Sequence, residues 1–406
     1  MMLRRLALAC ALLLFPLSAR AAPVWMESWA ASPTPPAQGP AASQYNPGFD
    51  NQTLVQVVRL SAGGHRLRVR FTNEYGQTPL AVGAARVGVL DQGGQQVAGS
   101  ERVLTFGGRP STIIPAGAPL LSDPVDLAVS PLSRLRIALY LPGTVKQCTC
   151  HVTGAQHLMI SPPGDYTERP FTAAGPTLPD YRAFLSAVDV ESPAPGPVVV
   201  ALGDSITDGY KSTDDANHRW PDRLAERLTE RAGVRSAAVV NAGISGNRLL
   251  ADAYIPPMGQ SALVRFDHDV LAVPGVTHVI ILEGVNDLGA VGVPLPTAES
   301  MIGAYRQLID RAHARGVKVI GATILPYEGA WYFHPEGEVL RQAVNTWIRT
   351  SGAFDGVIDF DVLMRDPQRP ARFKADLQAG DWLHPNDEGY RIMGDAIDLG
   401  LFDVKR

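Results

Sequence analysis

The chain has 406 residues, of which 46% are hydrophobic and 19% are charged, and its formal net charge is −4. This length exceeds that of an average domain, so we expect two domains, and the composition is that of a folded globular protein. The slightly acidic charge and the lack of any basic run after the first residues argue against nucleic acid or an anionic membrane surface as a partner.

Residues 1–21 have the pattern of a secretory signal peptide. Arg4 and Arg5 supply a charged start, residues 6–17 are apolar, and Ala19 and Ala21 are small residues at the positions that a signal peptidase reads. The apolar stretch is shorter than the roughly 20 residues of a spanning helix. We therefore expect export to the periplasm or the extracellular space, with no stable membrane insertion after cleavage; a retained anchor is the alternative.

The next part, residues 22–192, consists of short apolar-alternating runs separated by Gly, Pro and Asn. No stretch of helical length keeps a period of 3.6 residues, whereas alternation with a period of two is typical of strands with one buried face. The clearest predicted strands are 54–60, 66–71, 84–90 and 135–141. The pattern predicts an all-β domain of the sandwich or jelly-roll-like type.

Cys148 and Cys150 are the two cysteines that remain after signal cleavage. A disulfide between residues i and i+2 is uncommon, so the sequence leaves open whether the pair is bridged or only adjacent. A zinc site usually draws on two separated ligand pairs, and no second pair accompanies these cysteines. No metal is expected here.

Residues 193–197 include three prolines and are predicted to be a linker. From residue 198 to 406 strand-like and helix-like segments alternate. The predicted strands are 198–202, 237–240, 278–282, 318–324 and 357–360, and the predicted helices are 220–232, 298–315 and 336–350. Five apolar strands with intervening helices predict a doubly wound, flavodoxin-like parallel sheet, an α/β fold.

Polar residues follow the strands of this predicted sheet. Ser205 comes just after the first strand, Gly243 after the second and Asn286 after the third, while Asp381 and His384 follow the last one. Ligands of such sheets bind beyond the carboxyl ends of the strands, so we expect these residues to converge there. Because Asp381 and His384 are three residues apart, their side chains can share one side of a helical turn.

Together these residue types suit nucleophilic acyl transfer. A serine hydroxyl attacks once a histidine accepts its proton, and a carboxylate orients and stabilises that histidine. The backbone N–H groups of Ser205 and Gly243 and the side-chain amide of Asn286 could stabilise an oxyanion. Gly243, which lacks a Cβ, lets the reacting group approach the backbone.

The same segments resemble the signature blocks of the SGNH (GDSL) hydrolase superfamily, over about residues 198–400. The matching blocks are Gly203-Asp204-Ser205, Gly243, Gly284-Val285-Asn286-Asp287 and Asp381-Trp382-Leu383-His384-Pro385. The N-terminal part resembles the β-rich domain of secreted two-domain members, as in residues 71–76 and 162–167. The resemblance implies that Ser205 is the nucleophile, His384 the base and Asp381 its orienting acid. It also implies Ser205, Gly243 and Asn286 as oxyanion donors, and no cofactor.

Several other residues have plainer interpretations. Asp204 and Asp208 are expected to hydrogen-bond within the turn around Ser205, although a metal-dependent phosphoesterase could use them with His384. Trp331 and Tyr332 belong to an aromatic run that is either a packed loop or a wall of the substrate pocket.

The sequence therefore predicts a secreted serine esterase for small-molecule or polysaccharide esters. Short acyl chains, including acetyl groups on a glycan, are the expected substrates. A lipase or arylesterase for apolar esters is the alternative, and an exported, non-catalytic glycan-binding protein is the hypothesis from another class.

Overall fold

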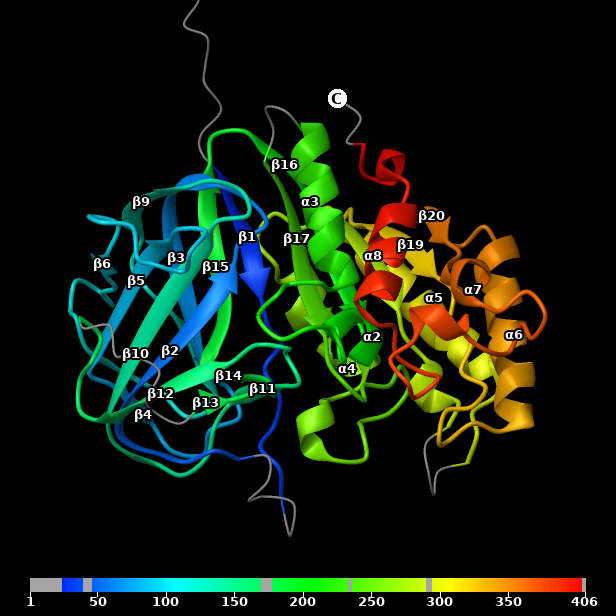
Figure 1. Ribbon diagram of the computed structural model, residues 1–406, viewed down its shortest axis with the longest axis horizontal. Helices are drawn as coiled ribbons and strands as arrows, with labels where there is room; N and C mark the ends of the chain where they lie inside the picture. Colours follow the sequence, from blue (N-terminus) through cyan, green and yellow to red (C-terminus); the bar gives the residue numbers. More distant parts are fainter. Residues whose placement is uncertain (1–23, 39–45, 169–176, 233–235, 290–293, 404–406) are drawn as a thin grey trace, which may run out of the picture.

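The computed structural model describes residues 24–38, 46–168, 177–232, 236–289 and 294–403. The predicted signal peptide lies outside these residues. Among the helices within these ranges, none combines the length and the apolar character needed to cross a membrane. Figure 1 shows a β-rich part beside a part in which helices surround a second sheet. We call residues 24–192 the β domain and residues 195–403 the α/β domain.

The β domain consists of two antiparallel sheets and two short strand pairs. The first sheet contains, in order, β1 (Val24–Ala30), β15 (Leu185–Ser192), β3 (Gly64–Asn73) and β8 (Ala118–Leu121), with β9 (Val125–Val129) also paired to β3. The second contains β13 (Thr177–Leu178), β12 (Leu158–Pro163), β2 (Phe49–Arg59), β10 (Arg134–Val145), β5 (Ala84–Leu90) and β6 (Arg102–Val103). The short pairs are β11 (Cys150–Val152) with β14 (Tyr181–Ala183), and β4 (Leu80–Val82) with β7 (Thr112–Ile114).

Alternating side chains explain why these strands form a sandwich. In the long pair of β2 and β10, Leu54 lies opposite Leu139 and Val58 opposite Leu135, and all four are buried. Successive side chains of a strand point to opposite faces, so one face of the pair enters the core. The predicted all-β sandwich is confirmed, and its four clearest strands are present.

A disulfide joins Cys148 to Cys150, which answers the question that the sequence left open. Cys150 begins β11, and its carbonyl accepts hydrogen bonds from Thr34 N at 2.8 Å and from Thr34 Oγ1 at 3.0 Å. The short strand is thus tied both to the disulfide and to the segment that follows β1.

The α/β domain contains a five-stranded parallel sheet in the order β17-β16-β18-β19-β20. Its strands are β16 (Pro195–Gly203), β17 (Ser236–Gly243), β18 (His278–Leu282), β19 (Lys318–Ala322) and β20 (Gly356–Ile358). The α-helices are α2 (Ser205–Asp208), α3 (Trp220–Ala232), α4 (Ala262–Phe266), α5 (Ala298–His313), α6 (Pro335–Thr350), α7 (Phe360–Met364) and α8 (Asp387–Ala396). Short single turns are η2 (Pro256–Met258), η3 (Asp267–Leu271), η4 (Val285–Asp287), η5 (Ala375–Leu377) and η6 (Leu399–Phe402). This order confirms the predicted doubly wound, flavodoxin-like sheet.

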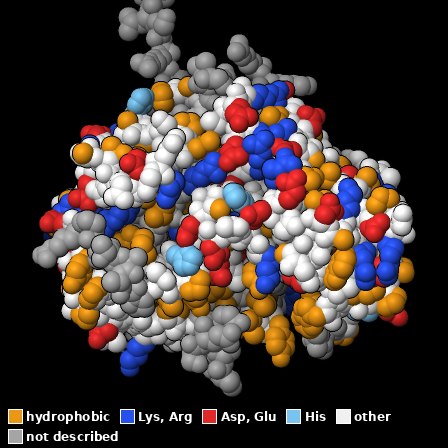
Figure 2. All heavy atoms as spheres, viewed as in Figure 1, with side chains coloured by type: hydrophobic (Ala, Val, Ile, Leu, Met, Phe, Trp, Pro, Cys, Tyr) orange, Lys and Arg blue, Asp and Glu red, His pale blue; other side chains and the backbone are white. Residues whose placement is uncertain are grey.

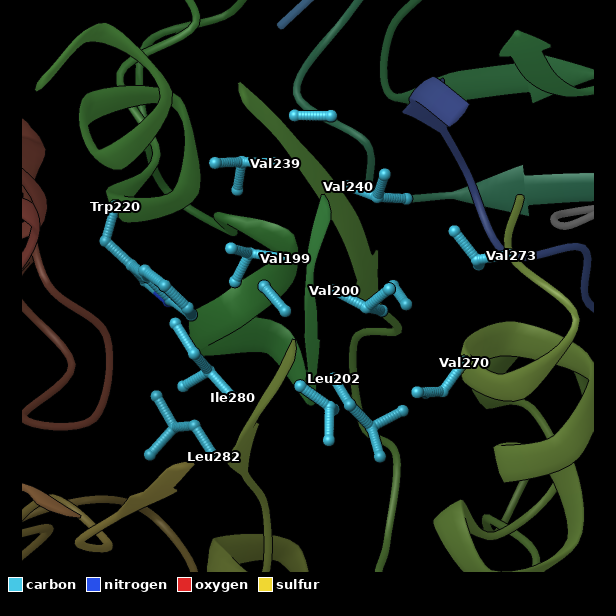
Figure 3. Close-up of a cluster of buried hydrophobic side chains, with 14 of the residues drawn as sticks. Val199, Val200, Leu202, Trp220, Val239, Val240, Val270, Val273, Ile280 and Leu282 are labelled. Carbon is cyan, nitrogen blue, oxygen red and sulfur yellow. The ribbon is translucent and has the colours of Figure 1, made fainter. Parts of the chain in front are cut away.

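The interior strand β16 is apolar on both faces. In Figure 3, Val199 points to the side of Trp220 from α3, and Val200 points to the opposite side, toward Val270 and Val273. All of these side chains are at most 5% exposed. A parallel strand covered by helices on both faces needs such a continuous apolar run, which is why residues 198–202 could be identified from sequence.

The expected linker is shorter than predicted. β15 ends at Ser192 and β16 already begins at Pro195, which pairs with Ser236 of β17. Pairing of β16 with β18 starts only at Val199, so Pro195 and Pro197 lie where β16 has a neighbour on one side. Proline is tolerated at such a position because no second ladder needs its missing N–H.

The two domains are joined along an extended interface, where β1 lies beside β17 (Figure 1). Glu27 N donates to Pro274 O at 3.1 Å, and Val239 N donates to Ser61 Oγ at 3.0 Å. On the face seen in Figure 2, acidic and basic side chains are interspersed.

Candidate active site

Ser205 is the first residue of the short helix α2, directly after β16. Asp204 is the N-cap, and its side chain accepts a hydrogen bond from Ile206 N at 2.9 Å. The helix ends at Asp208 with Gly209 as its C-cap, and the N–H of Ser205 donates to no acceptor among the described residues. The sharp turn from strand to helix therefore presents both the hydroxyl and the N–H of Ser205 at the carboxyl edge of the sheet.

His384 and Asp381 complete a hydrogen-bonded chain with this serine. Ser205 Oγ lies 2.9 Å from His384 Nε2, and His384 Nδ1 lies 2.7 Å from Asp381 Oδ2. Asp381 Oδ1 also accepts from the backbone N–H of His384 at 2.9 Å. Since the carboxylate can only accept, Nδ1 carries the proton and Nε2 is left to accept the serine proton.

The surroundings favour a charged Asp381. Partial burial opposes ionisation, but the hydrogen bonds from the ring and the backbone of His384 outweigh it and hold the pKa of Asp381 well below its ordinary value. The ring of Tyr210 packs edge-on against the imidazole, with 4.8 Å between the centroids. The histidine is thus held by a carboxylate on one side and an aromatic ring on another.

Asn286 lies in η4, the turn after β18, and its amide group is fixed from both ends. Nδ2 donates to Asn247 O at 2.9 Å, and Oδ1 accepts from the hydroxyl of Tyr332 at 3.3 Å. One N–H of the amide remains for a further acceptor. Asn286 therefore has the orientation that an oxyanion donor requires.

Gly243 is not placed as the sequence suggested. Its N–H donates to Asn241 Oδ1 at 2.8 Å. A Cβ on Gly243 would lie only 2.2 Å from the backbone N of Asp208, so glycine is needed here for close packing against α2. The expectation that this N–H faces the reacting group is not met, because a side chain already accepts it.

Gly246 is the better placed donor in the same loop. Within the described part of the chain its N–H has no acceptor, and the carbonyl of the next residue, Asn247, accepts from the Asn286 amide. Gly246 has a φ of 79°, a left-handed conformation that favours glycine. A second glycine three residues after Gly243 is visible in the sequence, but the sequence does not show which of the two N–H groups is free.

The two aromatic residues differ in their surroundings. The Tyr332 ring packs near Tyr327, with 5.9 Å between centroids, and its hydroxyl contacts Asn286. Trp331 is 80% exposed and meets Tyr332 edge-on at 5.1 Å. Tyr332 thus helps to fix Asn286, whereas the Trp331 indole is exposed and accessible to a ligand.

Arg265 is a buried residue that ties the site together and that sequence reasoning missed. Its guanidinium donates to the carbonyls of Gly203 at 2.9 Å and Ala242 at 2.7 Å, and to Asn247 Oδ1 at 2.9 Å. It therefore links the ends of β16 and β17 to the Gly246 loop. Nothing in its sequence context distinguishes it from a surface arginine.

Two buried carboxylic acids, Asp204 and Asp287, belong to the turns that carry Ser205 and Asn286. Burial raises the pKa of Asp204 to about 7, and the nearby charge of Asp287 adds to the shift. Burial also raises the pKa of Asp287 to about 6, although its oxygens accept from Leu249 N at 2.8 Å and Leu250 N at 3.0 Å. These acids anchor the loops around the site.

Asp204 and Asp208 serve different purposes. Asp204 hydrogen-bonds within the turn, as predicted. Asp208 does not: its carboxylate binds His151 of the β domain and Ser245. Within the ranges described, no three His, Cys, Asp or Glu side chains form a group that could hold a metal ion.

Comparisons with known proteins concern the α/β domain. Residues 201–392 match the model of the GDSL-like Lipase/Acylhydrolase family. No curated protein sequence matches the chain. Among solved structures, a lipolytic protein of the G-D-S-L family from Desulfitobacterium hafniense is 26% identical with a TM-score of 0.38, covering 50% of this chain and 97% of that chain.

Two further solved structures are similar at lower identity. A carbohydrate acetylesterase from Sinorhizobium meliloti is 16% identical with a TM-score of 0.39, covering 49% of this chain and 95% of that chain. An aryl esterase from M. smegmatis is 17% identical with a TM-score of 0.39, covering 50% of this chain and 96% of that chain.

Proposed function

We propose that this protein, a carboxylic ester hydrolase whose residues 201–392 match the GDSL-like lipase/acylhydrolase family, acts through a covalent acyl-enzyme on Ser205. The observation that carries this proposal is the chain of hydrogen bonds from Ser205 Oγ to His384 Nε2 at 2.9 Å and from His384 Nδ1 to Asp381 at 2.7 Å. It supplies a nucleophile, a base and an orienting acid in contact.

In the proposed reaction, His384 Nε2 takes the proton of Ser205 as Oγ bonds to the ester carbonyl carbon. The carbonyl oxygen becomes an oxyanion, which accepts hydrogen bonds from the N–H groups of Ser205 and Gly246 and from the Asn286 amide. His384 then gives the proton to the departing alcohol as the ester C–O bond breaks. A water molecule, deprotonated by the same nitrogen, hydrolyses the acyl-enzyme and restores Ser205.

The direct test of this mechanism is the Ser205→Ala variant with a simple aryl acetate. We expect turnover to fall by about a thousandfold or more, because the acyl-enzyme cannot form. Retention of activity by a folded variant would exclude Ser205 as the nucleophile.

We further propose that the substrates carry short acyl groups, including acetyl groups on a glycan. Ser205 is only 5% exposed and His384 only 7%, so access to the nucleophile is narrow, which favours a small acyl group. The exposed indole of Trp331 lies beside Tyr332 and offers a flat apolar surface for a sugar ring. The same indole could bind an aryl or apolar ester, which keeps an arylesterase or lipase as the second candidate.

A substrate panel separates these candidates. We expect kcat/KM to fall steadily from acetate to longer acyl esters of one alcohol. With acetylated xylan, Trp331→Ala should raise KM several-fold, while kcat/KM for methyl acetate stays within about twofold. A preference for long acyl chains would favour the second candidate. So would a Trp331→Ala variant that loses activity on aryl esters but not on the glycan.

Export remains part of the proposal. The charged start, short apolar run and Ala19/Ala21 site at the N-terminus support it, and the Cys148–Cys150 disulfide fits an oxidising compartment. The test is mass spectrometry of the mature protein from periplasm or culture medium. A chain that begins after Ala21 is expected, and an uncleaved chain in the cytosol would contradict export.

A further inference from the structure

A histidine of the β domain contacts the end of the short helix α2, which begins at Ser205. His151 lies in β11 and is 4% exposed. Its Nδ1 lies 2.9 Å from Ser32 O, and its Nε2 lies 2.9 Å from Asp208 Oδ1. A carbonyl and a carboxylate both accept, so both ring nitrogens donate and the buried ring is an imidazolium paired with Asp208.

Asp208 connects His151 to the active-site loop. It is the last residue of α2, the helix that begins at Ser205, and it is 3% exposed. Its second oxygen, Oδ2, accepts from Thr153 Oγ1 at 2.9 Å, from Ser245 Oγ at 2.7 Å and from Ser245 N at 3.1 Å. One carboxylate therefore joins the β domain, the nucleophile helix and the residue before Gly246.

Burial makes this arrangement sensitive to the loss of any partner. A charge in the interior is tolerated only while it is paired and hydrogen-bonded, so a neutral side chain in place of His151 leaves Asp208 without its counter-ion. Asp208 can then relax by taking up a proton, by moving α2 or by releasing Ser245. Either movement displaces a donor that the proposed reaction needs.

Contacts within the β domain fix the position of His151. The Cys148–Cys150 disulfide flanks His151, β11 pairs with β14, and Thr34 binds the carbonyl of Cys150. The position of His151 is thus set by the β domain and not by the loop that it contacts.

We propose that His151 is a positioning residue of the esterase site, which through Asp208 fixes the Ser245–Gly246 turn, so that the β domain completes the hydrolytic centre. The inference rests on the proposed function, because it assigns His151 a role in placing the oxyanion donor at Gly246.

The test compares His151→Gln with a matched control, His157→Gln, in the full chain. His157 also belongs to the β domain and pairs across the interface with a carboxylate, Asp215, at 2.7 Å, but it does not contact Asp208. For each protein, active sites are counted by titration with a fluorophosphonate. The kcat per titrated site, the KM and the Ki of an arylboronic acid are then measured, since a serine–boronate adduct carries the charge of the oxyanion.

For His151→Gln we expect kcat per site to fall about 10- to 100-fold and the boronate Ki to rise in step, with KM changed by less than about threefold. His157→Gln should behave like the wild type. A variant with fewer titratable sites but normal kcat per site would show that His151 only supports folding, and that result would overturn the proposal.

If His151→Gln does not fold, Ser245→Ala decides, because it removes the hydroxyl link to Asp208 and keeps the backbone. The same parallel loss of kcat and boronate affinity is expected, and unchanged values would overturn the proposal. Failure of the underlying function is distinguishable, because the wild type would then neither hydrolyse esters nor react with the fluorophosphonate.

Discussion

The hydroxyl of Tyr332 donates to Asn286 Oδ1 at 3.3 Å, while Nδ2 of the same amide donates to Asn247 O at 2.9 Å. Together the two contacts decide which end of the Asn286 amide faces the serine. If Tyr332 supports the site in this way, Tyr332→Phe should lower kcat about three- to tenfold, the equivalent of one hydrogen bond of about 1 kcal/mol, with little change in KM. Steady-state kinetics checks this. Tyr140→Phe, which loses an exposed hydroxyl contact in the β domain, is the control. An unchanged kcat would show that Tyr332 does not support the reaction through Asn286.

Asp381 orients His384 and keeps the proton on Nδ1. In Asp381→Asn the amide can present its N–H to the ring, so the proton moves to Nε2 and the base can no longer accept from Ser205. We expect kcat to fall by on the order of a thousandfold to ten-thousandfold. The variant Asp376→Asn, in the preceding turn η5, is the control. Loss of less than about tenfold would mean that Asp381 does not hold the tautomer.

The assignment of the oxyanion donor to Gly246 instead of Gly243 predicts a specific geometry. In a crystal structure of the phosphonylated enzyme, the phosphoryl oxygen should lie about 3 Å from the backbone N of Ser205, the N of Gly246 and Asn286 Nδ2. Gly243 N should still bond to Asn241 Oδ1. A phosphoryl oxygen bound by Gly243 N would restore the sequence-based assignment.

The domain interface contains a further histidine, His268, whose charge should matter for stability. His268 Nε2 lies 2.6 Å from Glu74 Oε1 of the β domain, and Nδ1 lies 2.5 Å from Asp269 Oδ1. The hydrogen bonds that the His268 ring donates to Asp269 and Glu74 raise the pKa of His268 to about 10. A raised pKa means that the stabilisation is complete below the unfolded value of about 6.5 and is lost as the pH rises through about 10.

Because the His268 side chain is 42% exposed, solvent screening reduces the effect, and we expect about 1 kcal/mol. Urea unfolding at pH 6.5 and at pH values up to about 10 should show a smaller pH-dependent loss in His268→Gln than in the wild type. His313→Gln, whose ring pairs with Asp355 inside the α/β domain, is the control. Identical pH profiles for wild type and His268→Gln would contradict the interface role.

The fold was predictable because its signals are local. The alternation in 66–71 and the apolar run in 198–202 each reflect how one strand is covered, and both became strands. The prolines at 195 and 197 predict a longer linker than the structure has, because the sequence does not show that β16 has only one neighbouring strand there. That information belongs to the sheet and not to the segment.

The site was predictable to the extent that its chemistry is carried by residue type and order. Ser205, Asp381 and His384 could be identified in this way, and the structure brings them into hydrogen-bond contact. Which glycine has a free N–H depends on the side chain of Asn241. The partner of Asp208 lies 57 positions away, at His151. Such long-range contacts leave no mark on the local pattern.

The central claim is that Ser205 is the nucleophile, and covalent labelling tests it most directly. The intact protein is treated with a fluorophosphonate, and the modified peptide is located by mass spectrometry. We predict one adduct, on Ser205, which is absent from Ser205→Ala and unaffected in the control Ser212→Ala, whose buried hydroxyl only bonds to Gly209 O. An adduct on another residue, or equal labelling of Ser205→Ala, would contradict the account.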